Sequence, residues 1–338
     1  MNILITGVTS FTGSALAREL IRRGHSVAGV LRPDSPNRTS VECITGLRLI
    51  EADMSDFDKL GDSIPQRFDI CIHLCWAGPG RLSRQDPLIQ AKNEAAALAM
   101  VSSAAKLGCR VFLFSGSQAE YGVTKERVLS GEADGLPVSE NTECRPLSEY
   151  GKSKLRMLTQ CGELSRSLGM RYLHLRIFSA YGEGDHSSSL VSLCCEAFRK
   201  GEHLKLSSCD QDWNMLYIVD CARAIAVLAE REASEQAECI SERETKEADC
   251  VVNVGSEDTR KLYAFVEEMR RICGKGSYEL SGSIPSPEGT PWVSPDTSRL
   301  RELTGFRPAV SFAEGIRRIL AAKTETDAFA AERQKQKE

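Results

Sequence analysis

The sequence predicts an α/β fold, a doubly wound parallel sheet with a smaller C-terminal lobe. Apolar runs rich in β-branched residues alternate with helical patterns through the first half of the chain, and such alternation implies crossover units and a parallel sheet covered on both faces. The runs are nearly continuously apolar, as strands buried on both faces should be. After Phe178 the elements become shorter and the chain is richer in Gly, Ser and charge, which indicates the second lobe.

The elements of the predicted sheet follow in chain order. The first strand contains the run Ile3-Leu4-Ile5, and the fourth contains Ile70-Cys71-Ile72, both typical of buried strands. Strands are expected at Met1–Thr6, Ser26–Leu31, Leu47–Glu51, Asp69–Cys75, Arg110–Ser115 and Arg171–Phe178, and helices at Thr12–Arg23, Asp86–Leu107 and Glu149–Ser167. These elements assign residues 1–178 to the sheet domain, with return segments at about 213–230 and 250–254. Residues 179–323 form most of the second lobe, and 324–338 are expected to be a frayed tail.

Composition and charge exclude several classes of protein. The 338 residues are 41% hydrophobic and 27% charged, which is the usage of a soluble globular chain and not of a disordered or membrane-spanning one. Lys and Arg total 43 against 47 for Asp and Glu, a net charge of −4. Because there is no basic excess, we expect neither nucleic acid nor a membrane as a partner.

Cysteines and the N-terminus bear on metal content and location. The 13 cysteines are scattered, often within apolar runs, and form no Cys-x-x-Cys unit. We interpret them as small buried side chains and expect no metal. A secretory signal would need a basic segment and a longer apolar stretch than Ile3-Leu4-Ile5, so we expect a cytoplasmic protein.

The first strand runs into a turn that predicts dinucleotide binding. The turn Thr6-Gly7-Val8-Thr9-Ser10-Phe11-Thr12-Gly13 lies between a strand and a helix, the context that a Rossmann-type phosphate-binding turn requires. Gly7 permits the tight turn, Gly13 permits close packing of the helix, and the amides near Ser10–Thr12 lie where the helix dipole favours a pyrophosphate. Ser10 replaces the middle glycine, and its side chain is expected to point away from the pyrophosphate or to hydrogen-bond it. Candidate cofactor residues here are Gly7, Thr9, Ser10, Phe11, Thr12 and Gly13, and residues 1–178 become the dinucleotide-binding domain.

The end of the second strand bears on the choice of cofactor. A carboxylate at this place holds the ribose of NAD, whereas arginine accommodates the 2′-phosphate of NADP. Here the residue is Arg32, with Ser35 and Arg38 following, so we favour NADP over NAD. The alternative is that Arg32 is a solvated surface residue. Asp53, after the third strand, is placed to accept a hydrogen bond from the adenine amino group.

Tyr150 and Lys154 form a candidate catalytic pair. They stand four residues apart in a predicted helix, which brings both to one face. A free tyrosine has a pKa of about 10, and an adjacent ammonium together with a nicotinamide cation would stabilise its phenolate as a base near neutrality. Alone, such a pair is more often two surface residues. A serine-bearing turn at Ser115-Gly116-Ser117, where a strand ends, supports the catalytic interpretation.

Several segments together resemble one family. The Thr6–Gly13 turn, the helix with Asn93, the strand end from Ser117 to Tyr121-Gly122, the Tyr150–Lys154 helix and the segment Leu175–Gly182 are similar to the extended short-chain dehydrogenase/reductase family, in its nucleotide-sugar epimerase/dehydratase branch. Later segments agree, namely Tyr217–Asp220, Val252–Gly255 and Gly305–Ile316. The resemblance covers nearly the whole chain.

The resemblance implies roles for individual residues. Ser117 would polarise the sugar hydroxyl or ketone, Tyr150 would exchange the proton, and Lys154 would bind the nicotinamide ribose and tune Tyr150, while the cofactor carries the hydride. It adds cofactor contacts at Met54, Trp76, Ala77, Asn93, Ser115 and Ile177, and substrate contacts at Ser117, Gln118, Ser179 and Trp213, in a C-terminal substrate-binding lobe. Trp76 is either a pocket wall or a packing residue, and Trp213 either stacks on the ligand or belongs to the core. The implied substrate is a nucleotide-diphosphate sugar, and a homodimer through the helices Asp86–Leu107 and Glu149–Ser167 is usual in similar proteins.

The same resemblance narrows the reaction. Dehydratases of this family place an acidic pair directly after the catalytic Ser or Thr, and here those positions are Gln118 and Ala119, so a 4,6-dehydratase is disfavoured. An epimerase or a 4-keto reductase acting at C4 of the sugar remains. A non-catalytic dinucleotide sensor is the alternative from another class, motivated by Ser10 and by Ser179 and Trp213, which replace a common asparagine and arginine. The intact set of Ser117, Tyr150 and Lys154 argues against a sensor.

Overall fold

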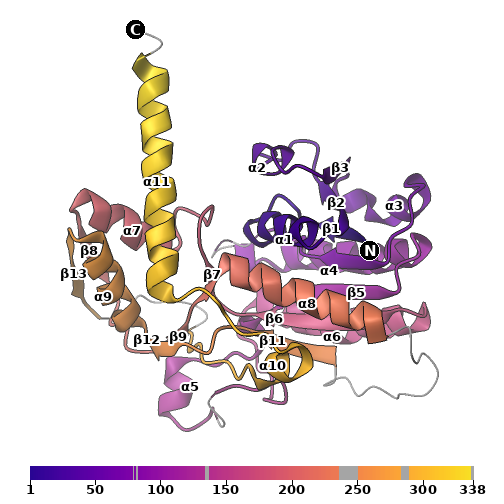
Figure 1. Cartoon of the computed structure of the whole chain (residues 1–338). Helices are drawn as coiled ribbons and strands as arrows, with labels where there is room; N and C mark the ends of the chain where they lie inside the picture. The colour runs from indigo at the N-terminus through magenta and orange to yellow at the C-terminus, as the bar shows by residue number, and fades with distance from the viewer. Residues whose placement is uncertain (79, 81–82, 134–136, 236–249, 283–288, 336–338) are drawn as a thin grey trace.

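A parallel sheet of seven strands forms the centre of the computed structural model (Figure 1). The strand order is β11-β6-β5-β4-β1-β2-β3, and every neighbouring pair is parallel. The structure describes residues 1–78, 80, 83–133, 137–235, 250–282 and 289–335, with the backbone alone at 235 and 325–335. The strands are β1 (Asn2–Thr6), β2 (Ser26–Leu31), β3 (Leu47–Glu51), β4 (Ile70–His73), β5 (Val111–Ser117), β6 (Arg171–Ile177) and β11 (Val251–Val254).

Helices cover both faces of this sheet. One group consists of α3 (Phe57–Ser63), α4 (Pro87–Lys106) and α6 (Glu149–Ser167), and the other of α1 (Phe11–Arg22), α8 (Ile218–Glu235) and α10 (Ser298–Thr304). Successive residues of a strand face opposite sides of the sheet. Leu4 therefore packs in the core of the first group, whereas Ile3 and Ile5 pack in the core of the second. The predicted doubly wound α/β fold is confirmed.

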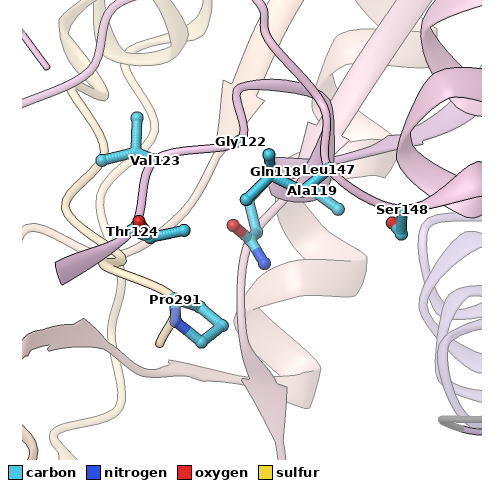
Figure 2. Close-up of a pocket in the computed structure, with 8 residues that line it drawn as sticks. All are labelled: Gln118, Ala119, Gly122, Val123, Thr124, Leu147, Ser148 and Pro291. Atoms are coloured by element: carbon cyan, nitrogen blue, oxygen red, sulfur yellow. The ribbon is translucent and has the colours of Figure 1, made fainter. Parts of the chain in front are cut away.

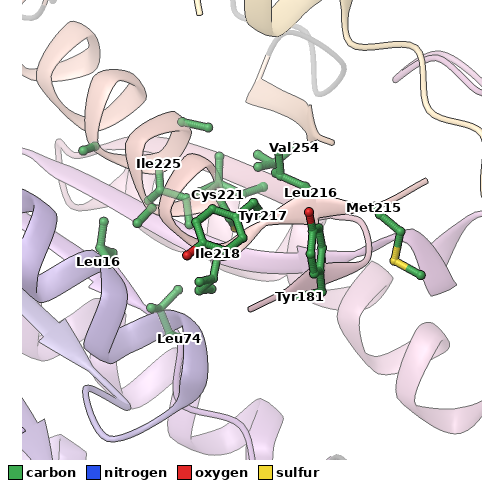
Figure 3. Packing of buried hydrophobic residues seen from close by; sticks show 14 of the residues in the cluster. Leu16, Leu74, Tyr181, Met215, Leu216, Tyr217, Ile218, Cys221, Ile225 and Val254 are labelled. Carbon is green, nitrogen blue, oxygen red and sulfur yellow. The ribbon is translucent and has the colours of Figure 1, made fainter. Parts of the chain in front are cut away.

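Among the described residues, the second lobe is built from three helices and pairs of short strands. Helices α7 (Leu190–Lys200), α9 (Leu262–Cys273) and α11 (Phe312–Lys335) pack against one another. Its small sheets pair β7 (Ala180–Tyr181) with β10 (Leu216–Tyr217), β8 (His203–Leu206) with β13 (Ser277–Leu280), and β9 (Asp212–Asn214) with β12 (Thr259–Lys261). Tyr181 and Leu216 belong to one hydrophobic cluster with Leu16 of α1 and Val254 of β11 (Figure 3). The lobe and the sheet domain therefore share a core.

The observed bounds lie within one or two residues of the predicted ones for the strands and helices expected in the sheet domain. β5 runs to Ser117, two residues beyond the predicted end, because the chain keeps pairing with β6 up to that residue. The return segment 250–254 does join the main sheet as β11. In the other return segment, β10 pairs with β7 and not with the main sheet, while α8 covers that sheet beside α1. The segment expected to be frayed is helical up to Lys335 at the end of α11.

The strand order places the functional loops at one edge. The chain leaves β1 toward β2 and β3 on one side, and continues from β4 through β5 and β6 on the other. In open parallel sheets a ligand binds at the carboxyl ends of the strands where this reversal occurs, here between β1 and β4. The Thr6 hydroxyl and His73 Nδ1 form a hydrogen bond of 2.8 Å at this point, which ties the ends of the two strands together.

Two further features of the described residues concern the cysteines and the possibility of a membrane span. Among the described cysteines, only Cys43 is exposed, and those in the strands and in α7 are buried, as the interpretation of small apolar side chains predicts. None of the helices in the described part of the chain combines the length and the apolar character that a membrane span requires.

Candidate active site

The turn after β1 has the close backbone approaches that a dinucleotide needs. Gly7 has φ +71°, and a Cβ at this position would lie 2.8 Å from the amide nitrogen of Cys75. A Cβ on Gly13 would lie 2.3 Å from the carbonyl oxygen of Gly7. Only glycine fits at either position. The residues present therefore fit the pyrophosphate of a dinucleotide, with the Phe11 and Thr12 amides in the first turn of α1, where a helix provides no acceptor of its own.

Ser10 has a structural role in this turn. Its Oγ accepts a hydrogen bond of 3.0 Å from the Gly13 amide and caps α1. The side chain is thereby directed to the helix, which is how a serine is accommodated where the middle glycine is common. Thr9 accepts a hydrogen bond of 3.1 Å from the Ser35 hydroxyl, so the turn is joined to the loop after β2.

The charged residues at the adenosine end are partly paired with one another. Arg38 forms ion pairs with the exposed carboxylates of Glu42 and Glu51, and its role as a phosphate contact stays a prediction. Arg32 is exposed at the end of β2. The hydrogen bond from the Ser55 amide is the main cause that lowers the pKa of Asp53, and the charge of Arg32 lowers it further. Of the two predicted arginines, Arg32 is the more exposed, and its contact with a 2′-phosphate stays a prediction.

The turn that bears Ser117 is fixed by a capping box. Ser117 Oγ accepts from the Ala119 amide at 3.2 Å, and Glu120 Oε1 accepts from the Ser117 amide at 2.7 Å. Both bonds belong to the short helix η3 (Gln118–Glu120), of which Ser117 is the N-cap. A serine hydroxyl that accepts from a backbone amide keeps its own hydrogen for another acceptor. Ser117 therefore has a proton to donate.

Helix α6 begins directly against this turn. Ser148 caps it by accepting from the Gly151 amide at 3.1 Å. A Cβ on Gly151 would lie 2.6 Å from the carbonyl oxygen of Ala119, which shows how closely α6 and η3 approach. This contact brings Tyr150, the residue before Gly151, to the turn of Ser117.

Lys154, one helical turn beyond Tyr150, is 2% exposed. Its Nζ donates to the Ser115 carbonyl oxygen at 2.6 Å and lies 3.4 Å from Ser115 Oγ. Burial lowers the pKa of Lys154 to about 7, although Glu120 opposes the shift. Its charge in turn adds to the effect of burial on His73, whose pKa falls to about 3. His73 is therefore neutral at physiological pH.

Aromatic and cationic groups surround Tyr150. The Trp76 ring lies 3.7 Å from Lys154 Nζ and meets the Tyr150 ring edge-on, with centroids 6.3 Å apart. On Tyr150 itself, the Arg84 guanidinium stacks at 4.3 Å from the ring centroid. Arg84 comes from η2 (Ser83–Gln85), in the connection between β4 and α4. The sequence singled out Trp76 but gave no sign of its contact with Lys154.

A buried charged network lies beneath the Ser117 turn. Glu120 accepts from His174 Nε2 at 3.0 Å and from Arg176 Nε at 2.8 Å, and all three side chains are almost fully buried. Burial alone would raise the pKa of Glu120, but His174 and Arg176 lower it to about 2. This network was not predicted from the sequence. The Ser-x-x-Glu spacing of Ser117 and Glu120 is a capping-box signature that could have indicated the role of Glu120.

A small, partly open pocket lies next to the same turn (Figure 2). In Figure 2 the Gln118 amide points into the pocket toward Pro291. The described residues that line it carry amide, hydroxyl and apolar groups but no charge; they are Gln118, Ala119, Gly122, Val123, Thr124, Leu147, Ser148 and Pro291. Such a lining suits a neutral, hydroxyl-rich ligand.

The remaining predicted residues lie at several places. Asn93 is buried in α4 and exchanges two hydrogen bonds with the Ala77 backbone, at 2.8 and 2.9 Å, so it holds the loop after β4. Met54 follows β3, Ile177 ends β6, and Ser179 accepts from the Leu216 amide. Trp213 packs partly buried against two hydrophobic clusters, as a core residue would, and is absent from the lining of the pocket.

Taken together, the sheet order, the turn after β1 and the pairing of Tyr150 with Lys154 beside Ser117 define a Rossmann-fold oxidoreductase of the short-chain dehydrogenase/reductase type. A model of the NAD dependent epimerase/dehydratase family matches residues 3–241. The chain belongs to this family, and the predicted resemblance and enzyme class are confirmed.

Similar proteins cover almost the whole chain. An uncharacterized UDP-glucose epimerase of Bacillus subtilis (strain 168) is 26% identical over 334 residues, 95% of this chain and 97% of that protein. A probable UDP-glucuronate 4-epimerase of Rhizobium meliloti (strain 1021) is 23% identical, over 95% of this chain and 96% of that protein.

Solved structures agree on the fold. The UDP-glucose 4-epimerase of Thermotoga maritima, crystallised with UDP-glucose, has a TM-score of 0.78 at 20% identity and covers 96% of this chain and 99% of its own. The dTDP-glucose 4,6-dehydratase of Streptomyces venezuelae, with NAD bound, has a TM-score of 0.79 at 18% identity, covering 97% and 98%. Because epimerases and a dehydratase match equally well, the fold does not select the reaction.

Proposed function

We propose that this protein is a nucleotide-diphosphate-sugar 4-epimerase that uses a tightly held nicotinamide dinucleotide. The observation that carries the proposal is the close approach of α6, which bears Tyr150 and Lys154, to the Ser117 turn. Gln118 of that turn and Ser148, the N-cap of α6, line the same small pocket. The relatives named as UDP-glucose and UDP-glucuronate epimerases support the reaction type.

The residues of this chain supply binding and proton transfer. When bound, the nicotinamide supplies the hydride acceptor and donor at C4 of the sugar. Ser117, whose hydroxyl accepts from the Ala119 amide, donates its hydrogen to the C4 oxygen. Tyr150 removes the proton of the C4 hydroxyl and returns it when the sugar is reduced again. Lys154 would hold the nicotinamide ribose through the Nζ hydrogens that it does not donate to Ser115, and its charge would stabilise the Tyr150 phenolate.

Dehydration is not proposed, because the residues that follow Ser117 lack the required acid. Gln118 and Ala119 both line the pocket, and neither side chain can donate or accept a proton as a carboxyl group does. The amide of Gln118 is instead suited to hydrogen-bond sugar hydroxyls without removing water from the sugar.

Turnover of nucleotide sugars tests the proposal. The purified protein is incubated with UDP-glucose, UDP-glucuronic acid and dTDP-glucose, and the C4 epimers are resolved by chromatography. Tyr150→Phe should lower kcat by about a thousandfold or more, since a positioned acid or base contributes about 10² to 10⁴. Tyr263→Phe, an exposed tyrosine of α9, is the matched control. Unchanged turnover in Tyr150→Phe would refute the assignment.

A 4-keto reductase is the second candidate, and exposed Arg32 favours it, since an arginine there suits NADP and a reductase consumes NADPH. The two functions differ in the fate of the cofactor. An epimerase returns its cofactor to the starting state in every cycle, so absorbance at 340 nm stays constant during turnover. Stoichiometric loss of that absorbance with a 4-keto sugar would establish the reductase.

We also propose a cytoplasmic homodimer formed through α4 and α6, which pack together on one face of the sheet. Leu88 at the start of α4 is 73% exposed, and burial of such side chains favours association. Sedimentation of the wild type and of Leu88→Glu measures this association. A wild-type monomer would refute the dimer.

A further inference from the structure

The ammonium of Lys154 lies between a carbonyl oxygen and an indole ring. The Ser115 carbonyl accepts from Nζ at 2.6 Å, and the Trp76 ring centroid lies 3.7 Å from the same nitrogen. The Phe114 ring lies farther away, at 4.7 Å. Among the described residues, no carboxylate forms an ion pair with Lys154. After the two Ser115 oxygens, the Trp76 face is the closest group that compensates for the lost hydration of this cation.

The indole is held in place by buried polar side chains. Trp76 Nε1 donates to Gln90 Oε1 at 2.9 Å, and Gln90 Nε2 donates to the Ser83 carbonyl at 3.0 Å. Gln90 and Asn93 are both fully buried in α4. Asn93 fixes the next residue, Ala77, through its backbone. The orientation of the ring is thus determined by α4 and not by loose packing.

The same ring also touches the catalytic tyrosine. Its plane is almost perpendicular to Tyr150, at 88°, and also to Phe114, at 85°. One side chain thus contacts both members of the Tyr150–Lys154 pair.

We propose that Trp76 is a positioning residue, which keeps Lys154 charged and directed toward Tyr150 by presenting its ring face to the ammonium and its anchored Nε1 to Gln90. The importance of this for turnover rests on the proposed function, but the effect on Lys154 does not. Without the ring, the buried ammonium loses a favourable contact, so a larger fraction of Lys154 is neutral near pH 7 and Tyr150 loses its cation.

Other titratable groups face this pair from each packed element. They are Glu120 of η3, His73 of β4 and Cys75 after it, Cys161 of α6, His174 of β6, and Arg84 of η2 on the far side of Tyr150. Because none of them is changed by substitution of Trp76, a shift in the Lys154 titration reports on the ring itself.

The titration of Lys154 tests the proposal without substrate. Protein labelled with ¹³C at lysine Cε is titrated by NMR, and Lys154→Met assigns the Lys154 signal. In Trp76→Leu we expect the pKa of Lys154 to fall by about one unit, a tenfold change equal to about 1.4 kcal/mol. Trp76→Phe keeps a ring but loses the anchor, and Gln90→Leu keeps the indole but loses its acceptor, so both should show smaller falls.

The matched control is a second lysine–tryptophan pair in the other lobe. Lys261 Nζ lies 4.4 Å from the Trp292 ring centroid, and Trp292→Leu should leave the Lys154 titration unchanged. An unchanged or raised pKa in Trp76→Leu overturns the proposal, and so does a fall in Trp76→Phe as large as in Trp76→Leu. If Trp76→Leu does not fold, the absence of a fall in both Trp76→Phe and Gln90→Leu overturns it.

The pH profile of turnover separates this inference from the proposed function. Because a Lys154 that is less often charged stabilises the Tyr150 phenolate less, the pH profile of kcat in Trp76→Leu should shift to higher pH. A profile identical to that of the wild type overturns the link to catalysis. A further outcome is that the wild type converts no nucleotide sugar while the pKa of Lys154 falls most in Trp76→Leu and less in Trp76→Phe and Gln90→Leu. In that case the proposed function fails and the role of Trp76 stands.

Discussion

Substitution of Glu120 by glutamine tests the buried network under the Ser117 turn. Glu120 is fully buried and accepts hydrogen bonds from the Ser117 amide, His174 and Arg176. Glu120→Gln keeps the shape of the side chain but leaves the guanidinium of Arg176 buried without a counter-charge. Removal of one partner of a buried ion pair costs about 3 to 5 kcal/mol.

The pKa of Glu120 supports a similar magnitude. The neighbours of this carboxyl lower its pKa from 4.5 to about 2, and a shift of that size corresponds to roughly 3 kcal/mol at neutral pH. Because the folded pKa is the lower one, this stabilisation is present above about pH 4.5 and is lost as the pH falls toward 2. The wild type and Glu120→Gln should therefore differ most at pH 7 and converge in acid.

Urea unfolding measures both effects. The unfolding midpoint of Glu120→Gln should fall at unchanged m-value, and the gap to the wild type should narrow between pH 5 and about pH 3. Glu143→Gln, which removes an exposed carboxylate paired with Arg145, is the control and should leave the midpoint in place. A loss below about 1 kcal/mol for Glu120→Gln at pH 7, typical of a surface pair, would refute the reasoning.

Three further predictions concern helix α6, the end of β2 and the cap of α1. Gly151→Ala places a Cβ 2.6 Å from the Ala119 carbonyl and should lower stability by about 1 to 3 kcal/mol, together with at least a tenfold loss of kcat; near-wild-type turnover would contradict the close approach of α6. Arg32→Ala should weaken NADP(H) binding about tenfold or more in calorimetry with little change for NAD(H), and tighter binding of NAD by the wild type would remove the basis for NADP. Ser10→Ala removes the cap of α1 and should cost about 1 kcal/mol in thermal unfolding, whereas an unchanged midpoint would show that the cap is dispensable.

Much of the fold follows from local patterns. Continuous apolar runs mark strands buried on both faces, and three predicted elements, Ser26–Leu31, Leu47–Glu51 and Glu149–Ser167, have the observed bounds. The turn at Gly7 and Gly13 was predictable because a Cβ would clash with the backbone at both positions, so that glycine itself is the signal in the sequence. The four-residue spacing of Tyr150 and Lys154 fixes their shared helix face for the same local reason.

Pairing between distant segments was not predictable in the same way. The sequence of β10 is compatible with pairing in the main sheet or in a small sheet of the second lobe. Its observed partner is β7, which follows β6 in the chain. The ion pair of Arg38 with Glu51 was not predicted, because it forms only where the neighbouring strand brings Glu51 close. Ion pairs of this kind depend on register between strands, which one-dimensional spacing does not contain.

The sequence by itself determined the doubly wound sheet, the turn after β1 and the candidate site residues, since each depends on spacing within one element or one turn. Only the tertiary structure decided how those residues are tuned. Trp76 and Lys154 are far apart in the chain and meet because β4 ends and α6 begins at the same edge of the sheet. Glu120 meets Arg176 because β5 and β6 are neighbours. Burial and the nearest charge set a pKa, and both are properties of the packed molecule.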